Sequence, residues 1–265
     1  MINLGSVPFL NARPLIYPLE NGLVDHDFNI FYYDPSLLSR KLNEKIVDIG
    51  LIPAAEFLKH DDYAALPDIS ISSYGKVDSV VLLSRDELKS IKTIAIDSRS
   101  QSSTALIKII FELFLGINPT YIKRKVGENF FDGVDSGMLI GNSGLKAVHS
   151  KDKNFLISDI GELWTNFTGL PFVYALFALK KDFDLKRGYQ ALIDSKNKGY
   201  DLIPKIVDIE HEKLGLTKED CFTYLSERIK FDLDSEKLKG LKEYQKLLFE
   251  LKELKIINDI EFYNK

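Results

Sequence analysis

Amide and hydroxyl side chains are the groups in this sequence that are best placed to bind a small molecule. Asn11 lies in the segment SVPFLNARPL, directly after the first expected strand. Its side chain offers two hydrogen-bond donors and an acceptor, so it can face a ligand at the end of that strand. An Asn in a loop also commonly bonds its own backbone within a turn. The loop alone does not separate these two roles.

Small polar residues recur where other expected strands end. They stand at Ser72, Ser73, Ser79, Ser102, Ser103, Gly141 and Asn142. The backbone N–H groups at the start of a helix attract anions, and hydroxyl side chains add donors without adding bulk. The same residue types also cap helices and form ordinary turns. Together the segments favour a cleft that binds a small anionic molecule.

The motifs that hold metals, nucleotides or covalent intermediates are missing from the sequence. Cys221 is the single cysteine, and the four histidines lack the HxH or HExxH spacing of zinc sites. No GxSxG nucleophile, Walker A motif or Rossmann glycine motif occurs. We therefore expect no metal and no cofactor, and an enzyme built on this chain would work by positioning and hydrogen bonding.

Charge and hydropathy set further limits. The net charge of −4 argues against nucleic acid as a partner, because phosphate contacts need a basic face. Apolar runs such as ALIKIIFELFLGI carry charges and fall short of the ~20 residues that a membrane span needs. The start, MINLGSVPFL, has no secretory pattern. We expect a cytoplasmic protein with a small-molecule substrate and no nucleic acid or membrane partner, while the oligomeric state is left open.

Two series of alternating strands and helices must hold these segments. The first runs through expected strands at Met1–Val7, Phe28–Tyr33 and Ile46–Ile52, with a helix that opens at Pro35. The second starts with a strand at Thr93–Ile96. This order predicts α/β sheets with parallel strands.

Two long apolar strands, Asp78–Ser84 and Pro171–Leu179, separate the series and predict two crossings between two lobes. The expected division gives residues 1–84 and 180–265 to the first lobe, and 85–179, with the returning strand, to an inserted second lobe. This is the arrangement of type II periplasmic binding proteins, an α/β fold with the ligand in the cleft between the lobes. We expect the Lys- and Glu-rich tail from Lys186 to form solvated helix faces, with no part in the chemistry.

Six segments in order resemble the chorismate dehydratase family of the futalosine route to menaquinone. They are SVPFLNARPL, DIGLIPAAEF, ISISSYGKVDSVVLLS, DSRSQSSTALIKII, MLIGNSGLKA and DIGELWTNFTGLPFVYALFAL. The Asn of the first segment matches at Asn11. The family's serines match at Ser72, Ser73, Ser79, Ser102 and Ser103. The chain departs from the family at Asn142, where Asp is frequent, and at Pro53 and Ala54, where Ser or Thr is frequent.

The resemblance implies a periplasmic-binding-protein fold used as a carbon–oxygen lyase. It implies loss of water from chorismate to give 3-[(1-carboxyvinyl)oxy]benzoate, with no cofactor. Serine hydroxyls and helix N–H groups would hold the carboxylates, and Asn11 would hydrogen-bond the reacting ring or its leaving hydroxyl. The enolpyruvyl carboxylate of the substrate could serve as the base.

Two alternatives from other classes remain open. One is the 1,4-dihydroxy-6-naphthoate synthase of the same route, which relies on a cleft His that the matched segments of this chain lack. The other is a non-catalytic solute-binding protein or sensor for a small carboxylate.

Overall fold

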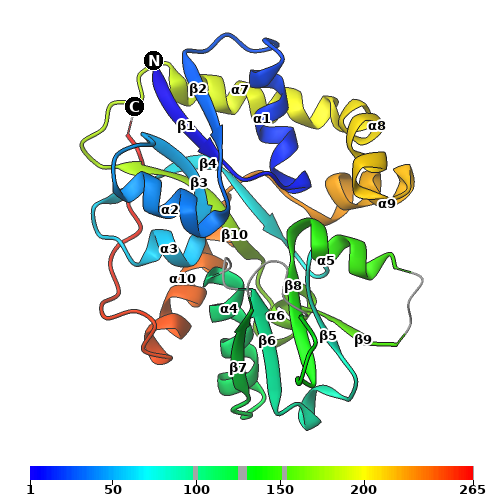
Figure 1. Cartoon of the computed structure of the whole chain (residues 1–265). Helices are drawn as coiled ribbons and strands as arrows, with labels where there is room; N and C mark the ends of the chain where they lie inside the picture. Colours follow the sequence, from blue (N-terminus) through cyan, green and yellow to red (C-terminus); the bar gives the residue numbers. More distant parts are fainter. Residues whose placement is uncertain (98–100, 125–129, 151–153, 265) are drawn as a thin grey trace.

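The computed structural model describes residues 1–97, 101–124, 130–150 and 154–264. These residues form two lobes, each built on a five-stranded sheet (Figure 1). The strand order in the first lobe is β2-β1-β3-β10-β4. Its strands are β1 (Ile2–Ser6), β2 (Phe28–Tyr32), β3 (Ile49–Pro53), β4 (Tyr63–Ser73) and β10 (Phe172–Lys180). The two-lobed α/β fold predicted from the sequence is confirmed.

Helices return the chain after each early strand, so β1, β2 and β3 are parallel. They are α1 (Arg13–Glu20), α2 (Pro35–Asn43) and α3 (Ala54–Leu58). Pro35 is the first residue of α2, a position where its missing N–H costs no helical hydrogen bond. The tail adds α7 (Gly188–Asp201), α8 (Ile203–Leu214), α9 (Lys218–Thr223) and the π-helical turn η4 (Tyr224–Arg228). Every residue of β3 is buried, because elements cover both faces of the sheet.

The second lobe has the strand order β7-β6-β8-β5-β9 among the described residues. Its strands are β5 (Val80–Ser84), β6 (Thr93–Asp97), β7 (Thr120–Arg124), β8 (Ser136–Ile140) and β9 (Leu156–Asp159). Its helices are α4 (Gln101–Lys108), which continues into the π-helix η3 (Ile109–Phe114), α5 (Gly141–Val148) and α6 (Ile160–Thr168).

The chain crosses between the lobes through the segments before β5 and before β10. The expected division placed residues 80–84 with the first lobe and 172–179 with the second, but β5 pairs in the second sheet and β10 in the first. Each of these two strands is antiparallel to both of its neighbours. Each enters its new sheet from the cleft, whereas the strands on both sides of it run toward the cleft. The expectation of purely parallel sheets is therefore wrong at these two strands.

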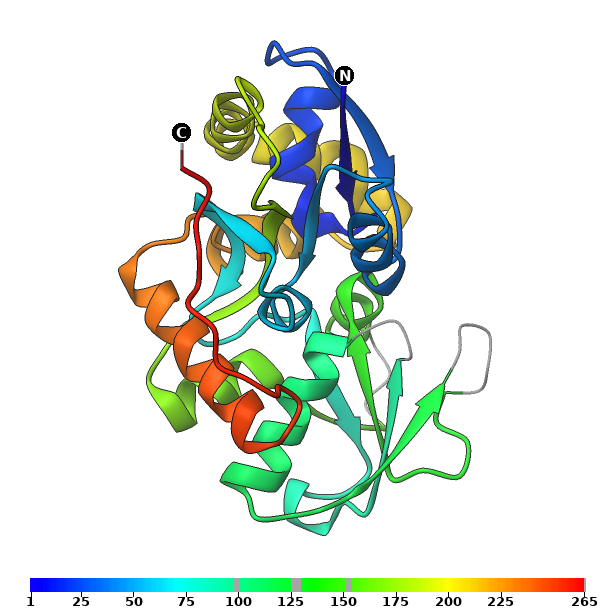
Figure 2. The same cartoon turned by 90° about the vertical axis from the view of Figure 1, so that its left-hand side faces the viewer.

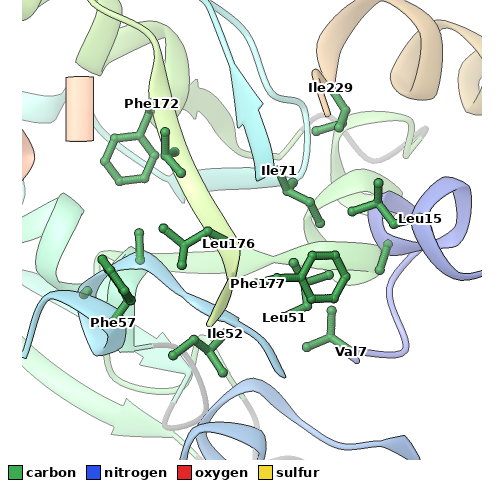
Figure 3. Packing of buried hydrophobic residues seen from close by; sticks show 14 of the residues in the cluster. Val7, Leu15, Leu51, Ile52, Phe57, Ile71, Phe172, Leu176, Phe177 and Ile229 are labelled. Atoms are coloured by element: carbon green, nitrogen blue, oxygen red, sulfur yellow. The ribbon is translucent and has the colours of Figure 1, made fainter. Parts of the chain in front are cut away.

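Strand β10 forms the centre of the first lobe's core. Leu176 and Phe177 are consecutive, so their side chains point to opposite faces of the sheet, and both are fully buried. Figure 3 shows them among apolar residues from β3, β4, α1 and α3. This packing fixes the strand ends that face the second lobe.

The C-terminal helix α10 (Ser235–Glu250) connects both lobes. It packs against β10 and α3, and Tyr244 donates a hydrogen bond to the carbonyl of Ser102 on α4 at 3.0 Å. The chain then returns to the first lobe, where Phe262 forms a bridge with Ala65, and both termini lie at that end (Figure 2). In the described part of the chain, no helix is long and apolar enough to cross a membrane.

Candidate functional site

A cavity lies between the two lobes, a place where small-molecule sites commonly occur. The first lobe contributes the ends of β1 and β3, and the second contributes the first turns of α4 and α5. The described residues that line the cavity are Val7, Phe9, Asn11, Pro35, Leu51, Pro53, Ile71, Ser79, Val80, Ser102, Ser103, Ile140, Gly141, Tyr174 and Ala175.

Most of this wall is apolar, and its polar side chains are neutral. They are Asn11, Ser79, Ser102, Ser103 and Tyr174. Tyr174 carries the one ionisable side chain among the described lining residues, and burial raises its pKa well above the ordinary value. The described part of the wall therefore offers a ligand hydrogen-bond donors and acceptors but no formal charge.

Asn11 presents an unused acceptor inside the protein. It lies in the 3₁₀ turn η1 (Leu10–Ala12), between β1 and α1. Its side-chain amide hydrogen-bonds to the hydroxyl of Tyr224, but its Oδ1 atom is buried without a partner among the described residues. An unpaired buried acceptor costs about 1–3 kcal/mol, so this oxygen is poised to accept a hydrogen bond from a ligand.

Ser79 lies on the outgoing crossing, just before β5. Its Oγ accepts a hydrogen bond of 2.8 Å from the hydroxyl of Tyr224, which comes from the turn η4. A hydroxyl that accepts one bond still has a proton to donate. Ser79 is thus equipped to donate to a ligand oxygen.

Ser102 and Ser103 lie in the first turn of α4, and both are buried. The Oγ of Ser102 accepts a hydrogen bond of 3.0 Å from the backbone N–H of Ala55 in the first lobe, so this contact spans the cleft. Helix α4 directs its N-terminal turn toward the cavity, which favours an anionic ligand group. Ser98, Arg99 and Ser100 of the same hydroxyl-rich segment lie outside the described residues.

The serines at the end of β4 lie behind the cavity wall. The hydroxyl of Ser73 is 3.0 Å from that of Tyr174, which does line the cavity. Gly161 makes room for this pair, since a Cβ there would lie 2.5 Å from the Tyr174 hydroxyl. Ser72 instead donates to the carbonyl of Lys230 in the tail, with which it also forms an isolated β-bridge. The structure thus places Ser73 behind Tyr174 and Ser72 away from the cavity.

Gly141 and Asn142 join the lobes at the start of α5. Gly141 lines the cavity with a φ of +55°, a conformation that suits glycine, and a Cβ there would lie 3.0 Å from the ring of Phe9. Asn142 lies outside the lining. Its Oδ1 accepts a hydrogen bond of 3.0 Å from the N–H of Leu10, and its amide donates to the carbonyl of Pro8 at 3.5 Å. Asn142 therefore holds the lobes together.

Replacing Asn142 by alanine should open the cleft of the ligand-free protein. Loss of about 1 kcal/mol of hydrogen bonding lowers the ratio of closed to open molecules roughly fivefold. Small-angle X-ray scattering should give a larger radius of gyration for Asn142→Ala than for the wild type. Asn142→Asp keeps the acceptor for Leu10 and should stay close to the wild type. Identical scattering from all three proteins would show that this contact does not hold the cleft closed.

Asp159 supports the crossing next to Ser79. Its carboxylate accepts backbone hydrogen bonds from Val77 at 3.0 Å, from Asp78 at 2.7 Å and from Glu162 at 3.0 Å, and it caps α6. Burial raises the pKa of Asp159 to about 6, although these three amides act to lower it. The carboxyl group is therefore set to titrate near neutral pH.

The raised pKa gives a stability prediction with a definite sign. The folded protein holds the Asp159 proton more tightly than the unfolded chain, so the stabilising contribution is full below pH 3.8 and is lost as the pH rises through about 6. The free energy of unfolding of the wild type minus that of Asp159→Asn should rise by up to about 3 kcal/mol from about pH 7 to about pH 4. Denaturant titrations at several pH values measure it. A difference that stays constant with pH would refute the shifted titration.

Two residues of the site, Tyr174 and Tyr224, lie in parts of the sequence where no functional residue was predicted. Tyr174 lies in an apolar run that indicated only a buried strand. Tyr224 lies in the tail, to which the sequence analysis gave no role in the chemistry, yet its hydroxyl contacts Ser79 and Asn11. The expectation of solvated helix faces is wrong at this turn, because Tyr224 is buried. Its partners are distant in sequence, so local patterns could not reveal the contact.

The two-lobed architecture with a cavity between the lobes defines a protein of the periplasmic-binding-protein fold. A protein from Archaeoglobus fulgidus is similar, with a TM-score of 0.75 and 16% identity over 96% of this chain and 98% of that chain. The periplasmic aliphatic sulphonate binding protein SsuA from Escherichia coli has a TM-score of 0.67 and 14% identity over 98% of this chain and 95% of its own. At these identities the likeness shows the fold alone.

The chain belongs to the menaquinone biosynthesis family, whose model matches residues 2–250. A curated relative named chorismate dehydratase, from Thermus thermophilus, is 28% identical over 217 residues. The match covers 76% of this chain and 80% of the relative. The resemblance indicated by the six segments is thereby confirmed.

Proposed function

We propose that the protein is a chorismate dehydratase of the futalosine route, a lyase that converts chorismate to 3-[(1-carboxyvinyl)oxy]benzoate and water. One observation carries the proposal. The cavity pairs an apolar wall with one unpaired acceptor, Asn11 Oδ1, and several serine hydroxyls. Chorismate has the complementary parts, which are a carbon ring, one hydroxyl group and two carboxylates. The name of the Thermus thermophilus relative points the same way.

In this proposal hydrogen bonds hold the carboxylates, because the described lining residues include no cationic side chain. Hydroxyl groups of Ser79, Ser102 and Ser103 donate to carboxylate oxygens, and the N-terminal turns of α4 and α5 add backbone N–H groups. The bonds of Ser102 to Ala55 and of Asn142 to Leu10 span the cleft and hold the two lobes together beside the ligand.

The dehydration itself needs one proton removed and one hydroxyl expelled. The C3–H bond breaks, its electron pair forms the C3–C4 double bond, and the C4–O bond breaks. The hydroxide takes up the proton that was removed from C3 and leaves as water, and the ring becomes aromatic. We assign the proton removal to the enolpyruvyl carboxylate of the substrate, since the described lining offers no carboxylate, imidazole or amine. Asn11 Oδ1 accepts a hydrogen bond from the C4 hydroxyl and fixes the ring for elimination.

A panel of three substrates tests the proposal. Purified protein is incubated with chorismate, with cyclised dehypoxanthine futalosine, or with a small carboxylate such as benzoate. Chromatography with mass spectrometry should find a product lighter by one water from chorismate alone. Turnover of the futalosine derivative would instead support the naphthoate synthase. Tight binding of chorismate with its unchanged return would support a sensor or solute-binding protein.

A further inference from the structure

The hydroxyl of Tyr224 connects two cavity residues that are far apart in sequence. It donates to Ser79 Oγ at 2.8 Å and accepts from the side-chain amide of Asn11. The side chain is 2% exposed, so all of this bonding takes place away from water. A phenylalanine would fill the same apolar space. The hydroxyl is therefore the part of this side chain that calls for a functional explanation.

The surroundings of Tyr224 hold it in place. It is the first residue of the π-helical turn η4, and such turns are frequent at functional sites. At the other end of this turn, Arg228 Nε donates to Asp78 Oδ2 at 2.8 Å. Just beyond it, Lys230 exchanges two backbone hydrogen bonds with Ser72, of 2.8 and 3.0 Å. The tail is thus attached at two points to the chain that leads up to Ser79, namely the end of β4 and the crossing.

The crossing is strained at the residue before Ser79. Asp78 has a φ of +59°, which is unusual for a residue with a side chain. Its backbone N–H donates to Asp159, and its carboxylate pairs with Arg228. Such strain persists only where the surroundings determine the conformation. Here the contacts of Asp78 with Asp159 and Arg228 fix the backbone so that the side chain of Ser79 points toward Tyr224.

We propose that Tyr224 is a positioning residue that sets the direction of the hydrogen bonds offered by Asn11 and Ser79 to the ligand. The amide N–H of Asn11 donates to Tyr224, Tyr224 donates to Ser79, and Ser79 donates into the cavity. The order leaves Asn11 with its oxygen facing the ligand. Asn11 then accepts a hydrogen bond from a donor group of the ligand, and Ser79 donates a hydrogen bond to an acceptor group of the ligand.

This inference rests on the proposed function and deepens it. With chorismate as the ligand, the hydroxyl group is the donor that Asn11 receives, and a carboxylate oxygen is the acceptor that Ser79 binds. The chain of three hydrogen bonds thereby selects molecules that carry a hydroxyl and a carboxylate at the matching separation. It also rejects the reverse orientation, which would set the carboxylate against the oxygen of Asn11.

The test is a double-mutant cycle with a matched tyrosine control. The proteins are the wild type, Tyr224→Phe, Ser79→Ala, the double variant and Tyr189→Phe. Tyr189 is also buried, but its hydroxyl bonds Asp68, and it is not among the lining residues. Turnover of chorismate and its affinity by calorimetry are measured for all five, together with melting temperatures.

Tyr224→Phe should lower kcat/KM by about 30-fold, while Tyr189→Phe stays within about 2-fold of the wild type. In the Ser79→Ala background, Tyr224→Phe should cost less, about 5-fold, because only the hydrogen bond to Asn11 is left to lose. A merely structural tyrosine would give the same fold loss in both backgrounds, and that result overturns the inference. So does a Tyr224→Phe protein with wild-type activity.

The two proposals fail in different ways. If the wild type binds chorismate without turning it over, the proposed function fails. The same double-mutant cycle, measured as dissociation constants for chorismate, then still tests the positioning role of Tyr224. Coupled losses of affinity support the positioning role, and independent losses overturn it. If the wild type neither binds nor converts chorismate, both proposals fall.

Discussion

Replacing Asn11 by alanine should lower the turnover of chorismate by roughly 10²–10³-fold and leave the melting temperature almost unchanged. The turnover falls because Asn11 Oδ1 is the acceptor that orients the leaving hydroxyl, and loss of one well-placed group at a reacting centre has effects of this size. The stability is spared because that oxygen is buried and unpaired without ligand. Its removal relieves about as much as the lost bond to Tyr224 costs.

The matched control for this variant is Asn21→Ala. Asn21 is exposed at the end of α1, where its side chain donates to the carbonyl of Tyr17 at 2.9 Å. It should show wild-type turnover and a slightly lower melting temperature. Parallel losses of turnover and melting temperature in Asn11→Ala would support the structural role of a turn residue instead.

Replacing Gly144 by alanine should disrupt both the fold and the site. A Cβ at this position would lie 2.5 Å from the backbone oxygen of Ser79 and 3.1 Å from that of Leu139. Neither backbone can move without shifting a wall of the cavity, because helix α5 packs on β5 and β8 through this glycine. We expect a loss of about 2–3 kcal/mol in the free energy of unfolding, as in other overpacked cores.

Activity should fall as well in Gly144→Ala, by about 10-fold or more, since the helix carries Gly141 and the displaced strand end carries Ser79, both lining residues. Thermal unfolding and chorismate turnover measure the two effects. Ser143→Ala, an exposed neighbour on the same helix, should change neither. A stable and fully active Gly144→Ala protein would mean that the close approach of α5 to the crossing is not needed.

The sequence predicted the fold where local order determines topology. Alternating strands and helices correctly indicated β1, β2, β3 and β6, because each helix returns the chain to the same edge. Strand β4 was missed, since Pro67 and Asp68 interrupt its apolar pattern; Asp68 has a φ of +64°, and the pairing with β10 is irregular there. The membership of β5 and β10 was also wrong, because two apolar strands at a crossing can pair in either lobe.

The candidate site was predictable in its loops but not in its inner contacts. Five of the eight proposed residues line the cavity, namely Asn11, Ser79, Ser102, Ser103 and Gly141. Four of them follow the end of a strand, where ligands of such sheets bind, and Ser79 lies just before β5. Asn142 was expected at the ligand and lies instead between the lobes, since its neighbours Pro8 and Leu10 come from the opposite side of the cleft. The role of Tyr224 could not be predicted, because its contacts with Asn11 and Ser79 form only in the folded chain and leave no local sequence pattern.

The most direct test of this account is an NMR time course of chorismate with the purified protein. We expect the ring signals to become aromatic while the two enolpyruvyl methylene protons remain, because one water leaves and the ether stays intact. An unchanged spectrum would contradict it, and so would release of pyruvate in place of water.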